Sequence, residues 1–145
     1  MKAAAFLVVG LLLSASAVAA GDNPAEKAIR QVLDAQVIAW NKGDLPGFME
    51  GYWQSPDLTF FSGGNKTRGW QATLDRYRKK YQGEGKEMGK LAFKELDVRL
   101  LGADHAVVTG RFQLQLKAET ATGIFTLILH KKDAGWRIVH DHTSS

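Results

Sequence analysis

The chain contains no cysteine among its 145 residues, which excludes disulfide bonds and a lipid-modified cysteine. The apolar run over residues 3–13 is too short to span a bilayer. Neither a GxGxxG nor a Walker sequence occurs, so the glycine-rich segment 83–89 gives no sign of a phosphate-binding loop. The positive charge is mild, at a formal +4. These absences point to one small domain with neither a membrane anchor nor a nucleotide site.

Residues 1–20 have the composition of a secretory signal peptide. Lys2 supplies a positive start, residues 3–13 an apolar core, and residues 17–20 the small side chains of a cleavage site. The lack of cysteine is more typical of a soluble bacterial periplasmic protein than of a disulfide-rich secreted module. We expect a periplasmic or secreted protein that consists of one domain, residues 21–145, with no membrane attachment after cleavage.

The densest positive charge is the run Arg-Tyr-Arg-Lys-Lys-Tyr at residues 76–81. Basic residues interleaved with aromatic ones can follow a phosphate backbone. On a helix, however, such a run presents a solvated basic face while its tyrosines turn inward. Because an exported protein rarely meets nucleic acid, we expect no nucleic-acid partner.

Helical spacing of apolar residues dominates the first half of the chain. Asn23 is a favourable N-cap for a helix over residues 24–42, and Asp44 can cap a shorter helix after it. A short strand is expected over residues 58–61 between two turn clusters, followed by a helix over residues 70–81.

The second half alternates between apolar and polar residues. Strands are predicted over residues 91–101, 106–117, 124–132 and 136–143, with a turn near residues 119–123. Helices followed by an antiparallel meander predict an α+β fold, in which N-terminal helices pack on the concave face of a curved antiparallel sheet.

The segment His-Lys-Lys-Asp-Ala-Gly-Trp-Arg-Ile-Val-His-Asp-His-Thr-Ser at residues 130–144 resembles the end of the association domain of calcium/calmodulin-dependent protein kinase II. That domain has the cone-shaped NTF2-like (cystatin-like) fold, shared with ketosteroid isomerase, the SnoaL-like cyclases and the small DUF4440 group. The resemblance covers residues 24–144 and implies this fold, a homodimer and a pocket arginine at Arg111. Leu127 stands where the association domain has a further arginine, which implies a less cationic pocket.

The pocket implied by this fold lies between the concave sheet face and the helices, and we expect its wall to be aromatic. Each ring could instead be an ordinary core residue, but tyrosine and tryptophan carry a polar group that needs a partner when buried. The candidate lining residues are Trp40, Tyr52, Trp53, Phe60, Trp70, Tyr77, Phe125 and Trp136.

Strand alternation puts Trp136, His140 and His142 on one face of the last strand and Asp141 on the other. If the first face is concave, the two imidazoles form the polar end of the pocket and are the candidate catalytic acid or base. If it is not, they meet a dimer partner or solvent. Two histidines lack a third ligand, so neither a metal nor another cofactor is expected.

The face of the strand on which Arg111 lies is also open. On the concave face, Arg111 would anchor a carboxylate or phosphate of the ligand. On the outward face, it would be solvated or lie in a dimer interface. The resemblance to the association domain favours the pocket.

Two functions fit these residues. The first is an exported, homodimeric module that binds a small organic ligand. A carboxylate on that ligand would be held by Arg111 and His140. The second is a SnoaL-like isomerase, dehydratase or cyclase that uses a pocket histidine as general acid or base. The sequence offers a base but no clear partner for a developing oxyanion, so it favours binding. A third possibility is that the exposed face of the sheet serves mainly to assemble oligomers of the protein.

Overall fold

Three helices pack against one six-stranded sheet in the computed structural model, which describes residues 23–145. The expected signal peptide, residues 1–20, lies outside the described residues. In chain order the elements are α1 (Pro24–Asn41), α2 (Leu45–Met49), β1 (Thr59–Ser62), β2 (Asn65–Arg68), α3 (Trp70–Tyr81), β3 (Lys90–Leu100), β4 (His105–Gln115), β5 (Thr120–Lys132) and β6 (Gly135–Ser144). None of the helices in this part of the chain is long and apolar enough to cross a membrane.

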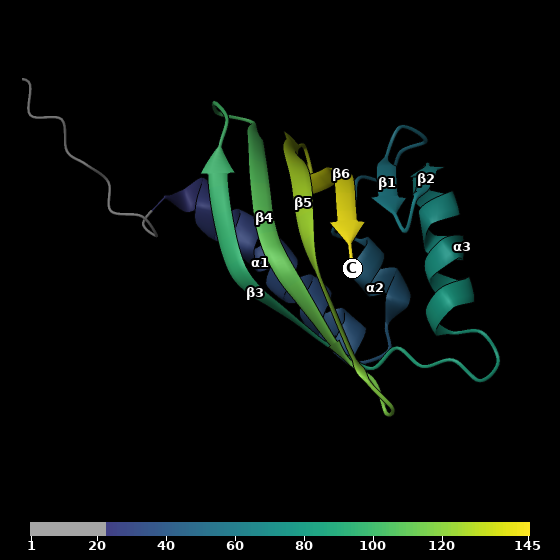
Figure 1. Cartoon of the computed structure of the whole chain (residues 1–145). Helices are drawn as coiled ribbons and strands as arrows, with labels where there is room; N and C mark the ends of the chain where they lie inside the picture. The colour runs from purple at the N-terminus through teal and green to yellow at the C-terminus, as the bar shows by residue number, and fades with distance from the viewer. Residues whose placement is uncertain (1–22) are drawn as a thin grey trace, which may run out of the picture.

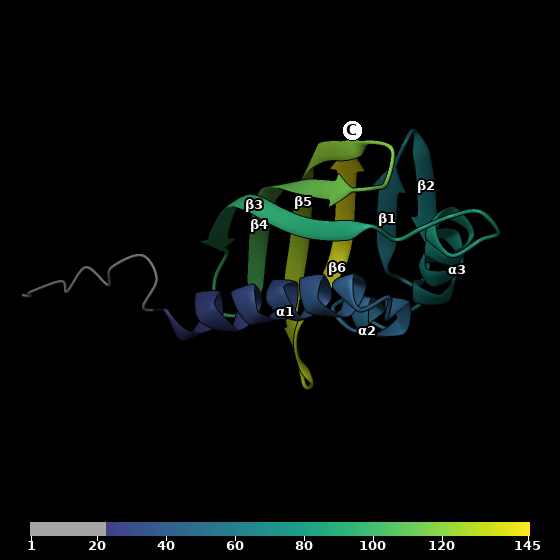
Figure 2. The same cartoon turned by 90° about the horizontal axis from the view of Figure 1, so that it is seen from below.

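The strands lie in the order β2-β1-β6-β5-β4-β3. Every neighbouring pair is antiparallel except β1 and β6, which are parallel. Figure 1 shows the long strands β3, β4 and β5 curving together, with β1, β2 and α3 beyond β6. In Figure 2, α1 and α2 run along one face of this curved sheet. The predicted α+β arrangement, with helices on a curved and mainly antiparallel sheet, is confirmed.

Local capping explains where the first two helices begin. The Asn23 side chain accepts a 2.9 Å hydrogen bond from the Ala25 amide at the start of α1. At the start of α2, Asp44 accepts one of 2.9 Å from the Gly47 amide. Between the two helices, Gly43 adopts a φ of 78°, a left-handed conformation that glycine tolerates best.

The hydrophobic core fills the space between helices and sheet. Burial of a leucine or isoleucine side chain contributes about 1.5–3 kcal/mol. The largest fully buried apolar side chains are Ile29, Leu33, Leu45, Met49, Leu58, Val108, Leu129 and Ile138. They come from α1, α2, the segment before β1 and the three central strands, so one core joins both halves of the chain.

Two local predictions differ from the structure. The hairpin partner β2 was not expected, because its Asn-Lys-Thr-Arg sequence has no apolar alternation and is largely exposed. The turn expected near residues 119–123 is also wrong. β5 already begins at Thr120, where it pairs with Gln115 of β4.

A bulge in β6 changes the faces of the last residues. Leu129 of β5 pairs with Ile138, but the preceding Ile128 pairs with His140, so Val139 is an extra residue in β6. An inserted residue reverses the alternation of every side chain that follows it. Asp141 is therefore buried on the helix-facing side of the sheet. The predicted common face of Trp136, His140 and His142 is wrong for this reason.

Candidate functional site

A cavity of about 100 Å³ lies between the curved sheet and all three helices. Its wall is mainly aromatic, with one polar wall formed by β6 and a basic edge formed by α3. The aromatic lining residues are Trp40, Phe48, Tyr52, Phe60, Tyr77, Tyr81, Phe93, Phe112 and Phe125.

Contacts between rings hold this wall in place. Phe60 and Tyr77 stack with centroids 5.4 Å apart, and Tyr77 stacks on Tyr81 at 5.9 Å. Trp40 meets Phe48 edge-on at 5.0 Å and donates its indole N–H to the Met88 carbonyl at 2.9 Å. Rings from α1, α2, α3 and β1 therefore pack against one another around the cavity.

Asp141 provides the polar wall. Its Oδ2 accepts a 2.7 Å hydrogen bond from the Tyr52 hydroxyl, and its Oδ1 accepts one of 2.6 Å from the Thr143 hydroxyl. The residue is only 3% exposed. Burial raises the pKa of the Asp141 carboxyl to about 6, against the bonds from Thr143 and Tyr52, which lower it. Both protonation states are thus accessible close to neutral pH.

Tyr52 reaches Asp141 because the backbone after α2 is fastened to β6. The Ile138 amide donates to the Gly51 carbonyl, and the Trp53 amide donates to the Ile138 carbonyl, both at 2.9 Å. These bonds make an isolated parallel bridge between Tyr52 and Ile138, one residue before the bulge. Burial, followed by the charge of Asp141, raises the pKa of Tyr52 well above its ordinary value, so the tyrosine stays protonated and serves as a hydrogen-bond donor.

The basic edge of the cavity comes from Arg76 and Lys80, one turn apart on α3. Arg76 donates to the Ser62 carbonyl at 2.7 Å and its guanidinium lies 5.0 Å from the centroid of the Phe60 ring. Lys80 lies over the Tyr81 ring at 5.1 Å. The run at residues 76–81, expected to be a solvated face, therefore also supplies cationic groups to the cavity.

Comparison with known proteins assigns the chain to a family. The family model of the SnoaL-like domain matches residues 29–145. The chain belongs to the SnoaL-like family. Among solved structures, an NTF2-like protein of unknown function from Shewanella oneidensis MR-1 is 39% identical to this SnoaL-like chain. The match covers 83% of this chain and 98% of that one, with a TM-score of 0.78.

Two further solved structures are similar at lower identity. One, named as a calcium/calmodulin-dependent protein kinase type II association domain, is from Thiobacillus denitrificans; it is 21% identical, with 79% and 92% of the two chains covered and a TM-score of 0.66. The other is a ketosteroid isomerase-like protein from Erwinia carotovora atroseptica, 20% identical, with 84% and 96% covered and a TM-score of 0.65. These two support the NTF2-like fold alone. No curated protein matches the chain.

In this SnoaL-like protein, the structure brings part of the predicted site together. The predicted residues that line the cavity are Trp40, Tyr52, Phe60, Tyr77 and Phe125. Trp70 lies outside it and donates its indole N–H to the Met49 carbonyl at 2.9 Å. Trp136 does not, because it is buried in the core before the bulge. Trp53 lies outside as well, with the Lys132 ammonium 4.2 Å from the centroid of its ring.

The two histidines expected in the pocket lie on the opposite face of β6. The His140 Nδ1 is 2.6 Å from the Thr59 hydroxyl of β1, and both His140 and His142 contact the ring of Phe61, with centroids 5.0 and 6.1 Å away. Burial, and then the nearby His142, lowers the pKa of His140. The expectation of a pocket histidine is corrected by the bulge at Val139.

Arg111 also faces away from the cavity. The residues before and after it on β4, Gly110 and Phe112, lie on the helix-facing side, where Phe112 lines the cavity. The Arg111 Nε is 3.6 Å from a carboxylate oxygen of Glu95 on β3. Its expected role as the pocket anchor is therefore corrected, and Arg76 and Lys80 are the cationic groups at the cavity.

Asp141 is the site residue that sequence reasoning excluded. Strict alternation assigned it to the face opposite the pocket, and no glycine near Val139 marks the bulge that reverses the alternation. The signal for Arg76 and Lys80 was present in the basic run, whose spacing places both residues on one side of α3.

Proposed function

We propose that this SnoaL-like protein binds a small, partly apolar ligand in the aromatic cavity, with a polar group of the ligand against Asp141. The observation that carries the proposal is the position of the buried Asp141 carboxyl in a cavity lined largely by aromatic rings, where Tyr52 and Thr143 donate to it. A carboxylate offers about four acceptor positions, so two protein donors leave capacity for a ligand. An apolar cavity of roughly 150 Å³ accommodates benzene, so this cavity of about 100 Å³ limits the enclosed part of the ligand to one ring at most.

The basic edge supports an anionic group on the ligand. A ring held between Phe60 and the Asp141 wall would place a carboxylate near Arg76 and Lys80 on α3. Arg76 is already bonded to Ser62 and Thr67, so it is held in position before a ligand arrives. A small aromatic carboxylate combines both features.

Calorimetric titration with benzoate, and with neutral benzyl alcohol of similar size, tests this proposal. Lys80→Gln should weaken benzoate binding about two- to fivefold, the range of a partly solvated ion pair, and leave benzyl alcohol unaffected. Arg111→Gln is the matched control, because this arginine lies on the outward face. Equal effects of Lys80→Gln and Arg111→Gln would contradict the cavity as the anion site. A complete lack of binding to both probes would contradict the ligand class.

A second candidate function is proton transfer by Asp141, in the manner of an isomerase or dehydratase. The observation that favours it is the pKa of about 6, because general acid–base catalysis works best when the pKa lies near the working pH. The acid or base would then be this carboxyl rather than a histidine. Incubation of small cyclic ketones with the protein in D₂O, followed by NMR, would detect catalysed exchange of the acidic C–H. Exchange that Asp141→Asn leaves unchanged would refute this role.

We propose in addition that the protein is exported and forms a homodimer through the sheet face turned away from the helices. The composition of residues 1–20 supports export. The homodimer rests on the resemblance of residues 130–144 to the association domain, and Ile124 of β5, 55% exposed, provides a position on this face at which to test it. Light scattering of Ile124→Lys against wild type tests the dimer, and N-terminal sequencing of protein recovered from the periplasm tests the cleavage.

A further inference from the structure

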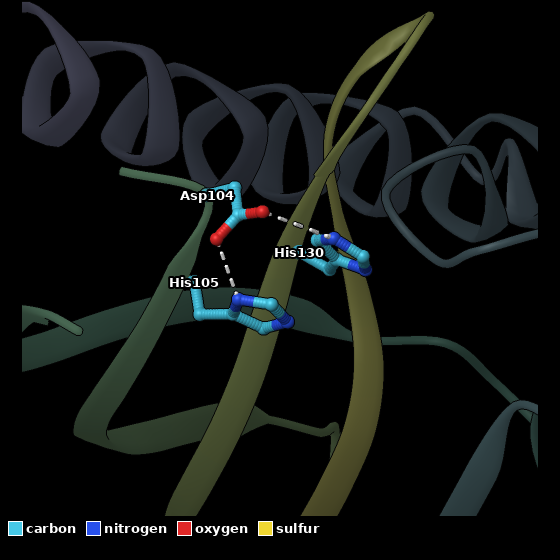
Figure 3. A group of neighbouring side chains, drawn as sticks. All are labelled: Asp104, His105 and His130. Atoms are coloured by element: carbon cyan, nitrogen blue, oxygen red, sulfur yellow. Dashed lines mark hydrogen bonds and ion pairs between the residues drawn. The ribbon is translucent and has the colours of Figure 1, made fainter. Parts of the chain in front are cut away.

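Three potential metal ligands meet at one end of the sheet, on residues that the proposed function does not use. Asp104 lies in the turn between β3 and β4, His105 begins β4, and His130 lies near the end of β5. The turn is fastened over β5, because the Lys131 amide donates to the Asp104 carbonyl at 2.7 Å. Figure 3 shows both imidazoles with a ring nitrogen turned toward the Asp104 carboxylate.

The register of the sheet creates this arrangement. His105 and His130 are direct partners across β4 and β5, and their rings stack with centroids 4.1 Å apart. The Asp104 carboxylate reaches both: Oδ1 is 2.7 Å from His105 Nδ1 and Oδ2 is 3.8 Å from His130 Nε2. One ligand atom from each of the three residues lies within 4.8 Å of the other two.

We propose that Asp104, His105 and His130 bind a divalent transition-metal ion such as zinc, with water completing the coordination. Imidazole nitrogen and carboxylate oxygen are ligands that zinc prefers. Ligand atoms about 2.0–2.1 Å from a tetrahedral zinc ion are roughly 3.3 Å apart. The two separations, one from each carboxylate oxygen, lie on either side of that value. Because the two rings stack with only 16° between their planes, one exposed imidazole must turn out of the stack, and the hydrogen-bonded proton must be lost, before both ring nitrogens point at one ion.

The site is distinct from the aromatic cavity. Ala106 follows His105 and Leu129 precedes His130, and both of these apolar neighbours are fully buried toward the helices. The two histidines thus lie on the outward face, with side chains 45% and 30% exposed. A bound ion would tie the β3–β4 turn to β5 and stabilise this end of the sheet, without contacting a ligand in the cavity.

One neighbouring charge limits the affinity. Arg137 of β6 pairs with His130 across the sheet, so a positively charged side chain lies beside His130 on the same face. Its guanidinium donates to the Trp136 carbonyl at 2.8 Å. With three protein ligands and this neighbour, the site should bind zinc less tightly than a four-ligand structural site.

Calorimetric titration of the full chain, free of a histidine tag, with zinc chloride tests the proposal. We expect saturable binding with one ion per chain, weakened at least tenfold by either His105→Gln or His130→Gln. The double variant His140→Gln/His142→Gln is the matched control, since it removes two histidines from another part of the same face and should leave the affinity unchanged.

Cobalt absorption spectroscopy supplies a readout that does not depend on heat. The visible bands of cobalt bound to nitrogen and oxygen ligands should appear in wild type and in the control, and be lost in Asp104→Asn, a variant that preserves shape at an exposed position. The proposal is overturned by non-saturable zinc binding, by unchanged binding in His130→Gln, or by equal weakening in the control. Each of these results leaves the proposed cavity function untouched, because the benzoate titration uses different residues.

Discussion

The Tyr52 hydroxyl donates a 2.7 Å hydrogen bond to Asp141, a residue 89 positions later in the chain. This bond joins the segment after α2 to the last strand across the inner wall of the cavity. Burial raises the pKa of this carboxyl to about 6, although the hydroxyl donors Thr143 and Tyr52 act in the opposite direction. The polar chemistry of the cavity therefore centres on a carboxyl and a tyrosine.

Tyr52→Phe should destabilise the protein in a pH-dependent way. At pH 7.5 the substitution removes a donor from an ionised, buried carboxylate, and hydrogen bonds to charged groups contribute roughly 1.5–3 kcal/mol. Below pH 5 Asp141 is mostly protonated, so the loss should be smaller. Urea denaturation at both pH values measures the difference. Tyr81→Phe is the control, because that tyrosine lies at the cavity but the bond to Asp141 comes from Tyr52. Equal losses at the two pH values would contradict the role of the Tyr52 bond.

Asp141 should make the folded state less stable as the pH rises from about 4 to about 6. Its pKa is higher in the folded protein than its ordinary value of 3.8, so the folded state binds this proton more tightly than the unfolded state. The contribution is complete below pH 4 and is lost as the pH passes through about 6. A rise from 3.8 to about 6 corresponds to about 3 kcal/mol. Comparison of wild type with Asp141→Asn by urea denaturation across this range isolates the effect. A slope that persists in Asp141→Asn would assign it to other groups.

Patterns of local origin were predictable from the sequence. The Asn23 cap and the helix at residues 70–81 follow from spacing within one turn or a few turns of chain. The long strands also follow, since their alternation is strong and their ends lie at turn residues. Such signals need no knowledge of what the segment packs against.

The site depended on relations that no local pattern contains. Alternation counted correctly along β6 still gave the wrong face for Asp141, because the extra residue at Val139 is visible only in the pairing with β5. Likewise, His105 and His130 are 25 positions apart in the sequence, and only the β4–β5 register makes them neighbours. Such errors affect the predicted site more than the predicted fold, because a bulge changes which side chains face the cavity and leaves the strand order unchanged.

Gly110→Ala should weaken both stability and ligand binding. A Cβ at this position would lie 2.7 Å from Phe125 Cζ and 2.8 Å from Leu96 Cδ2, closer than side-chain atoms can approach. Relief would push Phe125 toward the cavity that it lines. Overpacking of this kind costs about 1–3 kcal/mol. Thermal denaturation and benzoate titration of the same variant measure both effects. Gly63→Ala, in the β1–β2 turn with open space around its Cβ, is the control for ligand binding. Unaltered benzoate affinity in Gly110→Ala would contradict the inward displacement of Phe125.

His140 should titrate below the ordinary histidine pKa of 6.5, and His142 should contribute to that shift. Burial disfavours the imidazolium of His140, and the nearby His142 adds a like charge when protonated. A lowered folded-state pKa means that the unfolded chain binds this proton more tightly, so stability should increase as the pH rises from the folded pKa toward 6.5. NMR titration of the imidazole C–H signals measures the pKa directly. In His142→Gln the pKa of His140 should rise but remain below 6.5, because burial persists. His105→Gln, at the far end of the sheet face, should leave it unchanged. If His142→Gln and His105→Gln have the same effect, direct interaction between His140 and His142 is refuted.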